Sequence, residues 1–272
     1  MTTSRPFEPA TARSGGRRPL RAAAAAALFL CAVTARAEVQ PLKVDLRWDL
    51  PITIGAALGD LVLSSSLARP GHCKWCDTNR FDSWTRDQLR WSNPNAAGTA
   101  SDVLASAVLP AAVLANSFFS ARAGGAPSAV FWEDALVIAQ ATAIAGLLNG
   151  IAKDTFARRR PNAGLQATGD ANTSFYSGHT TQAFALAAAA GTVSTIRGYP
   201  SAPWVWAGGM TLAAGVGYLR VAADQHWATD VLAGAAVSGL VGWAVPWVFH
   251  RVNSPGARVA VLPAPGGFAV VY

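Results

Sequence analysis

Charged residues are scarce in this chain: Asp, Glu, Lys and Arg make up 14% of its 272 residues. The formal charge of +7 is concentrated at the N-terminus, because six of the 22 basic residues but one of the 15 acidic residues lie among the first 37. The rest of the chain has 16 basic and 14 acidic residues, a net charge of +2. A nucleic-acid-binding domain needs a basic face. We therefore expect no nucleic-acid partner.

The first 37 residues have the organisation of a secretory signal. Arginines up to Arg21 are followed by an apolar run over 22–33 and by the small-residue site Ala35-Arg36-Ala37. We predict cleavage after Ala37, which makes 1–37 a signal peptide and 38–272 the mature protein. No internal repeat or long low-complexity linker divides 38–272, so the sequence predicts a single domain there.

Cysteine is also scarce, with three in the chain, and only Cys73 and Cys76 follow the signal. A zinc site at this pair would need two further ligands, and only His72 is close. A thioredoxin-like role would need a β-α-β context that the surrounding sequence lacks. In an exported protein, a Cys-x2-Cys pair is most simply a local disulfide. We therefore predict a disulfide between Cys73 and Cys76.

Long apolar stretches, by contrast, recur six times after the signal. They cover 50–68, 100–121, 130–152, 179–195, 203–222 and 228–249, and each is about long enough to cross a bilayer as a helix. The sequence predicts an all-α bundle of about six helices, embedded in a membrane. A soluble bundle is the alternative, because buried helices can also be apolar on every side. Alternating patterns at 42–48 and 257–262, and a Pro-Gly turn before Phe268, predict short terminal strands.

Arg220, His226 and Asp230 form the first motif that suggests chemistry. Asp230 follows His226 by four residues, so on a helix its carboxylate lies on the face of the imidazole and can hold it. When one ring nitrogen donates to Asp230, the other has a lone pair for attack on phosphorus. Arg220 would bind the charge under attack. An ordinary ion pair on a helix surface is the alternative.

Ser177, Gly178 and His179 precede an apolar stretch, at a place where a helix is expected to begin. Ser177 is a suitable N-cap, and Gly178 lets the backbone approach a ligand closely. The N–H groups at a helix N-terminus bind anions such as phosphate. His179 would lie near the leaving group. The alternative is a helix cap followed by an interfacial histidine.

Lys153 and Arg160 are seven residues apart, so on a helix that ends at Pro161 they share one side. Two cations so placed can bind one anion. Arg158 and Arg159 complete a run of three arginines. A cytoplasmic anchor or a solvated run of charge is the alternative interpretation of this segment.

In this order, Lys-x6-Arg-Pro, Ser-Gly-His and Arg-x5-His-x3-Asp resemble the signature of the type 2 phosphatidic acid phosphatase and vanadium haloperoxidase superfamily. The resemblance covers roughly residues 100–250, the expected catalytic core, and implies an all-helical fold. It implies a catalytic group and a phosphate-binding group. The nucleophile would be His226, oriented by Asp230, with His179 as general acid; the phosphate would be bound by Lys153, Arg160, Ser177, Gly178 and Arg220. It implies neither a metal nor another cofactor for the phosphatase chemistry.

The chain departs from the family pattern at two positions. Tyr176 stands where the family usually has proline before Ser-Gly-His, and Leu219 stands where it usually has serine before the third-motif arginine. Neither change removes a catalytic group. The proline mainly shapes the loop, whereas the missing hydroxyl removes one hydrogen bond from the phosphate shell. The departures therefore bear on substrate preference more than on activity.

We expect a phosphatase that hydrolyses a lipid phosphate or lipid diphosphate through a phosphohistidine intermediate. Phosphatidic acid, phosphatidylglycerol phosphate, undecaprenyl diphosphate and a lipid A phosphate are all candidate substrates. Three alternatives remain: a vanadium-dependent haloperoxidase with vanadate in the same pocket, a soluble periplasmic non-specific acid phosphatase, and a non-catalytic lipid-binding membrane protein.

The side of the membrane that the site faces depends on how many apolar stretches cross. If all six cross after removal of the signal, the three motifs face the cytoplasm; if 50–68, which contains Asp60, does not cross, they face the periplasm. By helix parity the predicted disulfide shares a side with the motifs, and it needs an oxidising compartment. We therefore expect a bacterial-type inner membrane protein with a periplasmic active site, or else a soluble periplasmic protein.

Overall fold

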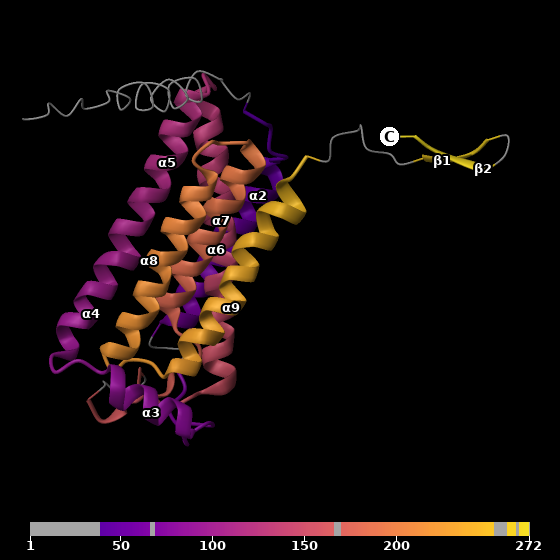
Figure 1. Ribbon diagram of the computed structural model, residues 1–272. Coiled ribbons are helices and arrows are strands. Elements are labelled where there is room, and N and C mark those ends of the chain that lie inside the picture. The colour runs from indigo at the N-terminus through magenta and orange to yellow at the C-terminus, as the bar shows by residue number, and fades with distance from the viewer. Residues whose placement is uncertain (1–38, 66–68, 166–169, 253–259, 265–266, 272) are drawn as a thin grey trace, which may run out of the picture. The chain divides into compact units, whose positions relative to one another are not determined.

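The computed structural model describes residues 39–65, 69–165, 170–252, 260–264 and 267–271. The expected signal peptide, 1–37, lies outside these residues. In the described part the chain is helical apart from one hairpin, so the predicted all-α class is confirmed (Figure 1). The long helices are α2 (Leu46–Ser64), α4 (Pro94–Val103) with α5 (Leu109–Ala123), α6 (Ser128–Phe156), α7 (Gly178–Arg197), α8 (Ala202–Ala222) and α9 (Ala228–Val245).

Two of these helices extend through π-helical turns, Leu104–Val108 between α4 and α5 and Pro246–His250 after α9. Each of the six predicted apolar stretches thus corresponds to one long helix. A shorter helix, α3 (Arg80–Leu89), was missed and lies in the polar connection. Asn79 caps it by accepting a hydrogen bond from the Asp82 N–H at 2.8 Å. Figure 1 shows α3 across one end of the bundle, where it packs on α8 and α9.

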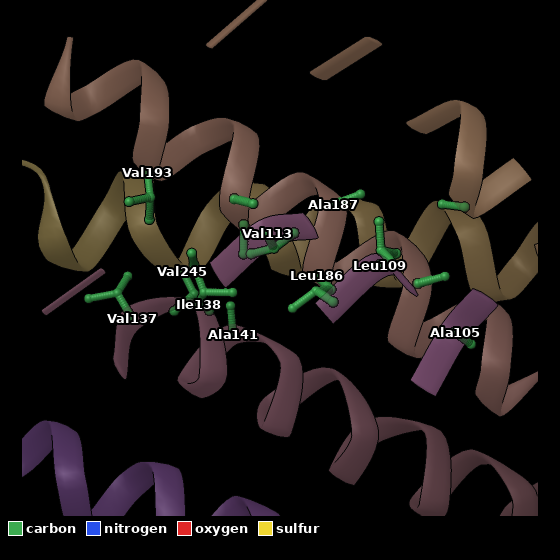
Figure 2. Close-up of a cluster of buried hydrophobic side chains, with 14 of the residues drawn as sticks. Ala105, Leu109, Val113, Val137, Ile138, Ala141, Leu186, Ala187, Val193 and Val245 are labelled. Carbon is green, nitrogen blue, oxygen red and sulfur yellow. The ribbon is translucent and has the colours of Figure 1, made fainter. Parts of the chain in front are cut away.

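The centre of the bundle is α7, which packs against α5, α6, α8 and α9. Its middle is a run of alanines, and these small side chains let neighbouring helices approach closely. The approach of α9 needs glycine at position 242, because a Cβ there would collide with the carbonyl oxygen of Ala185. Figure 2 shows the apolar core around this helix, where Leu186 and Val193 lie among side chains of the surrounding helices.

Large apolar side chains also cover the outside of the helices. Trp48, Phe119, Trp132, Leu240 and Phe249 are between 61% and 69% exposed. Apolar exposure on this scale marks a surface that faces lipid or a partner rather than water. Among the described residues, three helical segments are long and apolar enough to cross a membrane: Pro94–Ala123, Ser128–Phe156 and Ala228–His250. The protein is therefore a membrane protein. The other three of the six expected spans, the helices α2, α7 and α8, do not meet these criteria of length and apolar composition.

The terminal strands are confirmed at one end of the chain and wrong at the other. Strands β1 (Ala260–Ala264) and β2 (Gly267–Val271) form an antiparallel hairpin in which Leu262 pairs with Ala269. The strand predicted over 42–48 is replaced by a single bridge between Leu42 and Arg251 and by the start of α2. The helix begins there because the Asp45 carboxylate accepts a hydrogen bond from the Arg47 N–H and caps it.

Candidate active site

The three sequence motifs meet at the end of the bundle that α3 covers. Lys153 lies in the last turn of α6, Arg220 lies in the last turn of α8, and Gly178 is the first residue of α7. They line a pocket of about 150 Å³ with three further predicted residues, Arg160, His179 and His226. The other two of the eight predicted residues, Ser177 and Asp230, are buried beside it.

His226 is buried, with 3% of its surface exposed, in the short connection between α8 and α9. Its Nδ1 lies 2.9 Å from the backbone oxygen of Ser174. Because a carbonyl oxygen can only accept, Nδ1 bears the proton and Nε2 has the lone pair. The pKa of His226 is lowered well below 6.5, because burial and then the charges of Arg160, Arg220 and Lys153 disfavour the imidazolium. The ring is therefore neutral and nucleophilic near pH 7.

Asp230 does not hold His226 in the way that its spacing predicted. Its Oδ2 is 3.7 Å from His226 Nδ1, beyond hydrogen-bonding distance. The carboxylate instead accepts hydrogen bonds from Ser174 Oγ, the Trp227 N–H and Arg158. The prediction placed both residues on one helix, but α9 begins only at Ala228, so His226 lies outside it. Asp230 therefore acts on His226 through Ser174.

Arg158 also belongs to this site, although the sequence analysis did not include it among the predicted site residues and interpreted it as part of a run of solvated arginines. It is fully buried, and its guanidinium donates to Asp82 at 2.6 Å and to Asp230 at 2.5 Å. The same group lies 3.9 Å from the centre of the Trp75 ring. Asp82 and Arg158 are 76 residues apart, and no local pattern pairs them.

The backbone around Arg158 is held on both sides. Ala157 follows the end of α6 and has a left-handed backbone conformation, with a φ of 41°, which residues with a Cβ seldom adopt. This turn directs the following residues back toward the pocket. The Lys74 N–H donates to the Ala157 oxygen at 3.1 Å, and the Arg159 N–H donates to the Trp75 oxygen at 3.0 Å. Lys74 and Trp75 lie between Cys73 and Cys76, which a disulfide joins with 5.4 Å between their Cα atoms.

Arg160 reaches the pocket, and no carboxylate among the residues that the structure describes forms an ion pair with it. Its Nε donates to the Asp170 backbone oxygen at 2.9 Å, and its Nη atoms donate to Gln225 Oε1 and Thr173 Oγ1 at 3.1 and 3.2 Å. All of these acceptors are neutral. Burial, and next the charge of Arg220, lower the pKa of Arg160 to about 10. An anion in the pocket would relieve this concentration of positive charge.

The start of α7 contains the other residues that the sequence predicts to bind phosphate, Ser177 and Gly178. Ser177 Oγ accepts hydrogen bonds from Thr180 Oγ1 at 2.9 Å and from the Thr180 N–H at 3.4 Å, so Ser177 is the predicted N-cap. Its own hydroxyl proton is left to donate to a ligand. A Cβ at Gly178 would lie 3.1 Å from Lys153 Nζ, so glycine lets the lysine rest on the first turn of the helix. The helix N-terminus and a cation thus face the same space.

Asp102, from the end of α4, was not among the predicted site residues. Its Oδ1 lies 2.9 Å from His179 Nε2 and 3.1 Å from an Nη atom of Arg220. Arg220 also donates to Ser101 Oγ at 2.9 Å. Ser101 of α4 thus provides a hydroxyl beside Arg220, whereas Leu219, which stands where the family usually has serine, has no hydroxyl. Asp102 thus contacts both the expected general acid and one of the cations expected to bind phosphate.

No group of three or more His, Cys, Asp or Glu side chains that could hold a metal ion occurs among the residues that the structure describes. The hydrogen-bond donors that line the pocket are ammonium, guanidinium, imidazole and hydroxyl groups, and the carboxylates of Asp154 and Asp170 also line it. The cations outnumber these two carboxylates, and the donors suit a tetrahedral oxyanion because each of them can donate to its oxygens.

Comparison with known proteins gives a consistent result. The PAP2 superfamily model matches residues 134–254, a range that contains all eight predicted site residues. A Lipid A 1-phosphatase of Porphyromonas gingivalis is 31% identical over 212 residues, which cover 78% of this chain and 40% of that protein. The chain thus spans less than half the length of this curated relative.

Among solved structures, the chain is similar to the first transmembrane PAP2 type phosphatidylglycerolphosphate phosphatase from Bacillus subtilis. The two are 20% identical, the comparison covers 72% of this chain and 94% of the other, and the TM-score is 0.48. The family match and the curated relative confirm the resemblance that the three motifs suggested, and the chain belongs to the PAP2 superfamily.

Proposed function

We propose that this protein is a phosphatase that hydrolyses a lipid phosphate or lipid diphosphate through a phosphohistidine intermediate, without a metal ion. One observation carries the proposal: a buried, neutral His226 donates its Nδ1 proton to the Ser174 carbonyl and keeps its Nε2 lone pair within a cationic pocket. A neutral imidazole is the nucleophilic form, and the cations stabilise the charge on the phosphoryl oxygens.

The proposed reaction proceeds in two steps. Lys153, Arg160 and Arg220 bind the phosphoryl oxygens, and the hydroxyl of Ser177 and the backbone at Gly178 donate to them. His226 Nε2 forms a bond to phosphorus as the bond to the leaving oxygen breaks, and that oxygen takes a proton from His179. Water then attacks the phosphohistidine, His179 accepts a proton from it, and inorganic phosphate leaves with the imidazole restored.

Asp102 supports the acid role of His179. Burial, and next the charge of Arg220, lower the pKa of His179 to about 4, and the Asp102 carboxylate, 2.9 Å from His179 Nε2, opposes this shift by stabilising the protonated ring. The Asp102 side chain is 57% exposed and contacts both His179 and Arg220, which line the pocket. We therefore assign Asp102 as a positioning residue for both His179 and Arg220.

A lipid substrate fits the position of the pocket. It lies at the ends of α6, α7 and α8, and Leu63 and Ser64 from the end of α2 line it. Helix ends that flank membrane-crossing segments lie at the level of lipid headgroups. A relative named for its action on lipid A supports a lipid phosphate as the substrate class.

The test is the release of inorganic phosphate by the full chain, purified in detergent. We expect release from phosphatidic acid, phosphatidylglycerol phosphate, undecaprenyl diphosphate or lipid A, undiminished by EDTA and inhibited by vanadate, which mimics pentacoordinate phosphorus. Loss of activity in EDTA that a divalent ion restores would contradict the metal-independent mechanism. Halide oxidation dependent on added vanadate, without phosphate release, would favour a haloperoxidase.

We further propose that the active site faces the periplasm. The disulfide between Cys73 and Cys76 supports this orientation, because such bonds persist in oxidising compartments. The residues between them are hydrogen-bonded to Ala157 and Arg159, so this loop and the catalytic pocket lie on the same side of the membrane. The alternative with six crossings would put both in the cytoplasm.

Thiol labelling in intact cells tests this orientation. A membrane-impermeant maleimide should label neither Cys73 nor Cys76 until an impermeant reductant is added, and should then label both. The pair is close to the surface, so a reductant can reach it. Thiols that react only after lysis, without prior reduction, would place the site in the cytoplasm and exclude periplasmic lipid diphosphates as substrates.

A further inference from the structure

A second cavity, of about 630 Å³, lies next to the catalytic pocket and shares Arg160 with it. Its walls come from the connections around the pocket rather than from the long helices, and they include His72, Arg159, Asn172 and Trp227. Residues 170–173 separate the two spaces, because Asp170 and Thr173 line the pocket whereas Asn172 lines the cavity. The mechanism proposed above does not use this cavity.

The sizes of the two spaces indicate different occupants. The catalytic pocket, at about 150 Å³, is small for a complete ligand and has room for a phosphoryl group. Ligand sites usually occupy about 300–1,000 Å³, and the cavity falls within this range. The polar part of a substrate beyond its scissile phosphate therefore has a place beside Arg160.

The side chains of the cavity select an anionic occupant. Arg159, Arg160 and His72 contribute to its walls, and no Asp or Glu does among the described residues. Arg159 is exposed, and in the described part of the chain no carboxylate lies within ion-pairing distance of it, in contrast to Arg158. A guanidinium with unused donors binds phosphate in a bidentate manner.

Arg159 is also held in place by its backbone. Its N–H donates to the Trp75 oxygen at 3.0 Å, and its carbonyl accepts a hydrogen bond from Trp227 Nε1 at 2.8 Å. The second contact also fixes the Trp227 indole at the cavity wall. An aromatic ring with neighbouring amide and guanidinium groups offers both an apolar face and polar partners to a ligand.

We infer that this cavity binds the remainder of a large lipid headgroup that has a second anionic group, while the scissile phosphate of the same lipid occupies the catalytic pocket. This inference rests on the proposed function and specifies its substrate class. Arg160 lies between the two spaces and contacts both parts of the headgroup, and Arg159 binds the second anionic group. A lipid whose headgroup is the phosphate alone leaves the cavity empty.

The inference is tested by the selectivity between two lipids: a bisphosphorylated disaccharide lipid and phosphatidic acid. The measured quantity is kcat/KM for the first divided by kcat/KM for the second. The wild-type protein should favour the saccharide, and Arg159→Gln should lower the ratio about tenfold, the effect expected for one charged hydrogen-bonding contact. Arg159→Lys, which keeps the charge but cannot donate two parallel hydrogen bonds to one phosphate, should lower the ratio less.

Arg80→Gln is the matched control. Arg80 is an exposed arginine at the start of α3 and lines neither space, so its substitution removes the same charge nearby and should leave the ratio unchanged. A ratio that Arg159→Gln does not change, with both lipids hydrolysed, would overturn the inference and leave the proposed function standing. Equal loss on both lipids would also overturn it, because Arg159 would then act on the catalytic pocket. Phosphate release by the wild type from neither of these lipids, nor from phosphatidylglycerol phosphate or undecaprenyl diphosphate, would refute the proposed function itself.

Discussion

His226→Ala is expected to lower kcat by about four to six orders of magnitude, because it removes the atom that bonds to phosphorus. His226 Nε2 has the lone pair in the pocket, and no other histidine is placed there with a proton-accepting carbonyl behind it among the described residues. The measurement is phosphate release from a lipid phosphate, together with trapping of acid-labile phosphate on the denatured enzyme. The variant should form no phosphoenzyme.

His179→Ala provides the comparison. A general acid contributes about 10²- to 10⁴-fold, so kcat should fall less than in His226→Ala. With a leaving group that needs little protonation, such as p-nitrophenolate, this variant should still accumulate phosphoenzyme. Near-native lipid hydrolysis by His226→Ala would show that the nucleophile has been assigned wrongly.

Arg158→Met is expected to lower the free energy of unfolding by about 3–5 kcal/mol, because it leaves the buried carboxylates of Asp82 and Asp230 without their cation. The exposed fractions of all three side chains are 0%, so water cannot take the place of the guanidinium. Denaturant titration in detergent gives the stability, and kcat should also fall, because Asp230 holds Ser174 against His226.

Arg159→Met is the matched control for stability. Arg159 is the next residue, of the same type, but its side chain is exposed, so the change should remain within about 0.5 kcal/mol. Equal stability losses in the two variants would contradict the assignment of Arg158 as a buried structural cation. A stability loss in Arg158→Met with kcat unchanged would separate its structural role from the positioning of His226.

The sequence by itself determined the features of this protein that depend on neighbouring residues. Apolar stretches predicted every long helix, because a segment of about 20 apolar residues satisfies its backbone only as a helix in a membrane or core. The N-cap at Ser177 followed from one residue type before an apolar run. The spacing of three motifs was enough to select eight residues, six of which line one pocket.

The hydrogen-bonding partners of those residues were decided by the tertiary structure. Asp230 and His226 have helical spacing, but α9 begins between them, so Ser174, from a connection 52 residues earlier, orients the ring instead. The exact first residue of a helix depends on capping contacts, and a sequence pattern predicts it only to within one or two residues.

The partners of Arg158 and Asp102 could not be predicted from the sequence either, because they are distant in the chain. Arg158 is buried because Trp75 covers it and because Asp82 and Asp230 neutralise it, and these residues come from the connection between α2 and α4 and from α9. Asp102 reaches His179 and Arg220 because α4 packs beside α8. A charged residue has the same local pattern whether it is solvated or buried, and only the packing of distant segments supplies the opposite charge that makes burial possible.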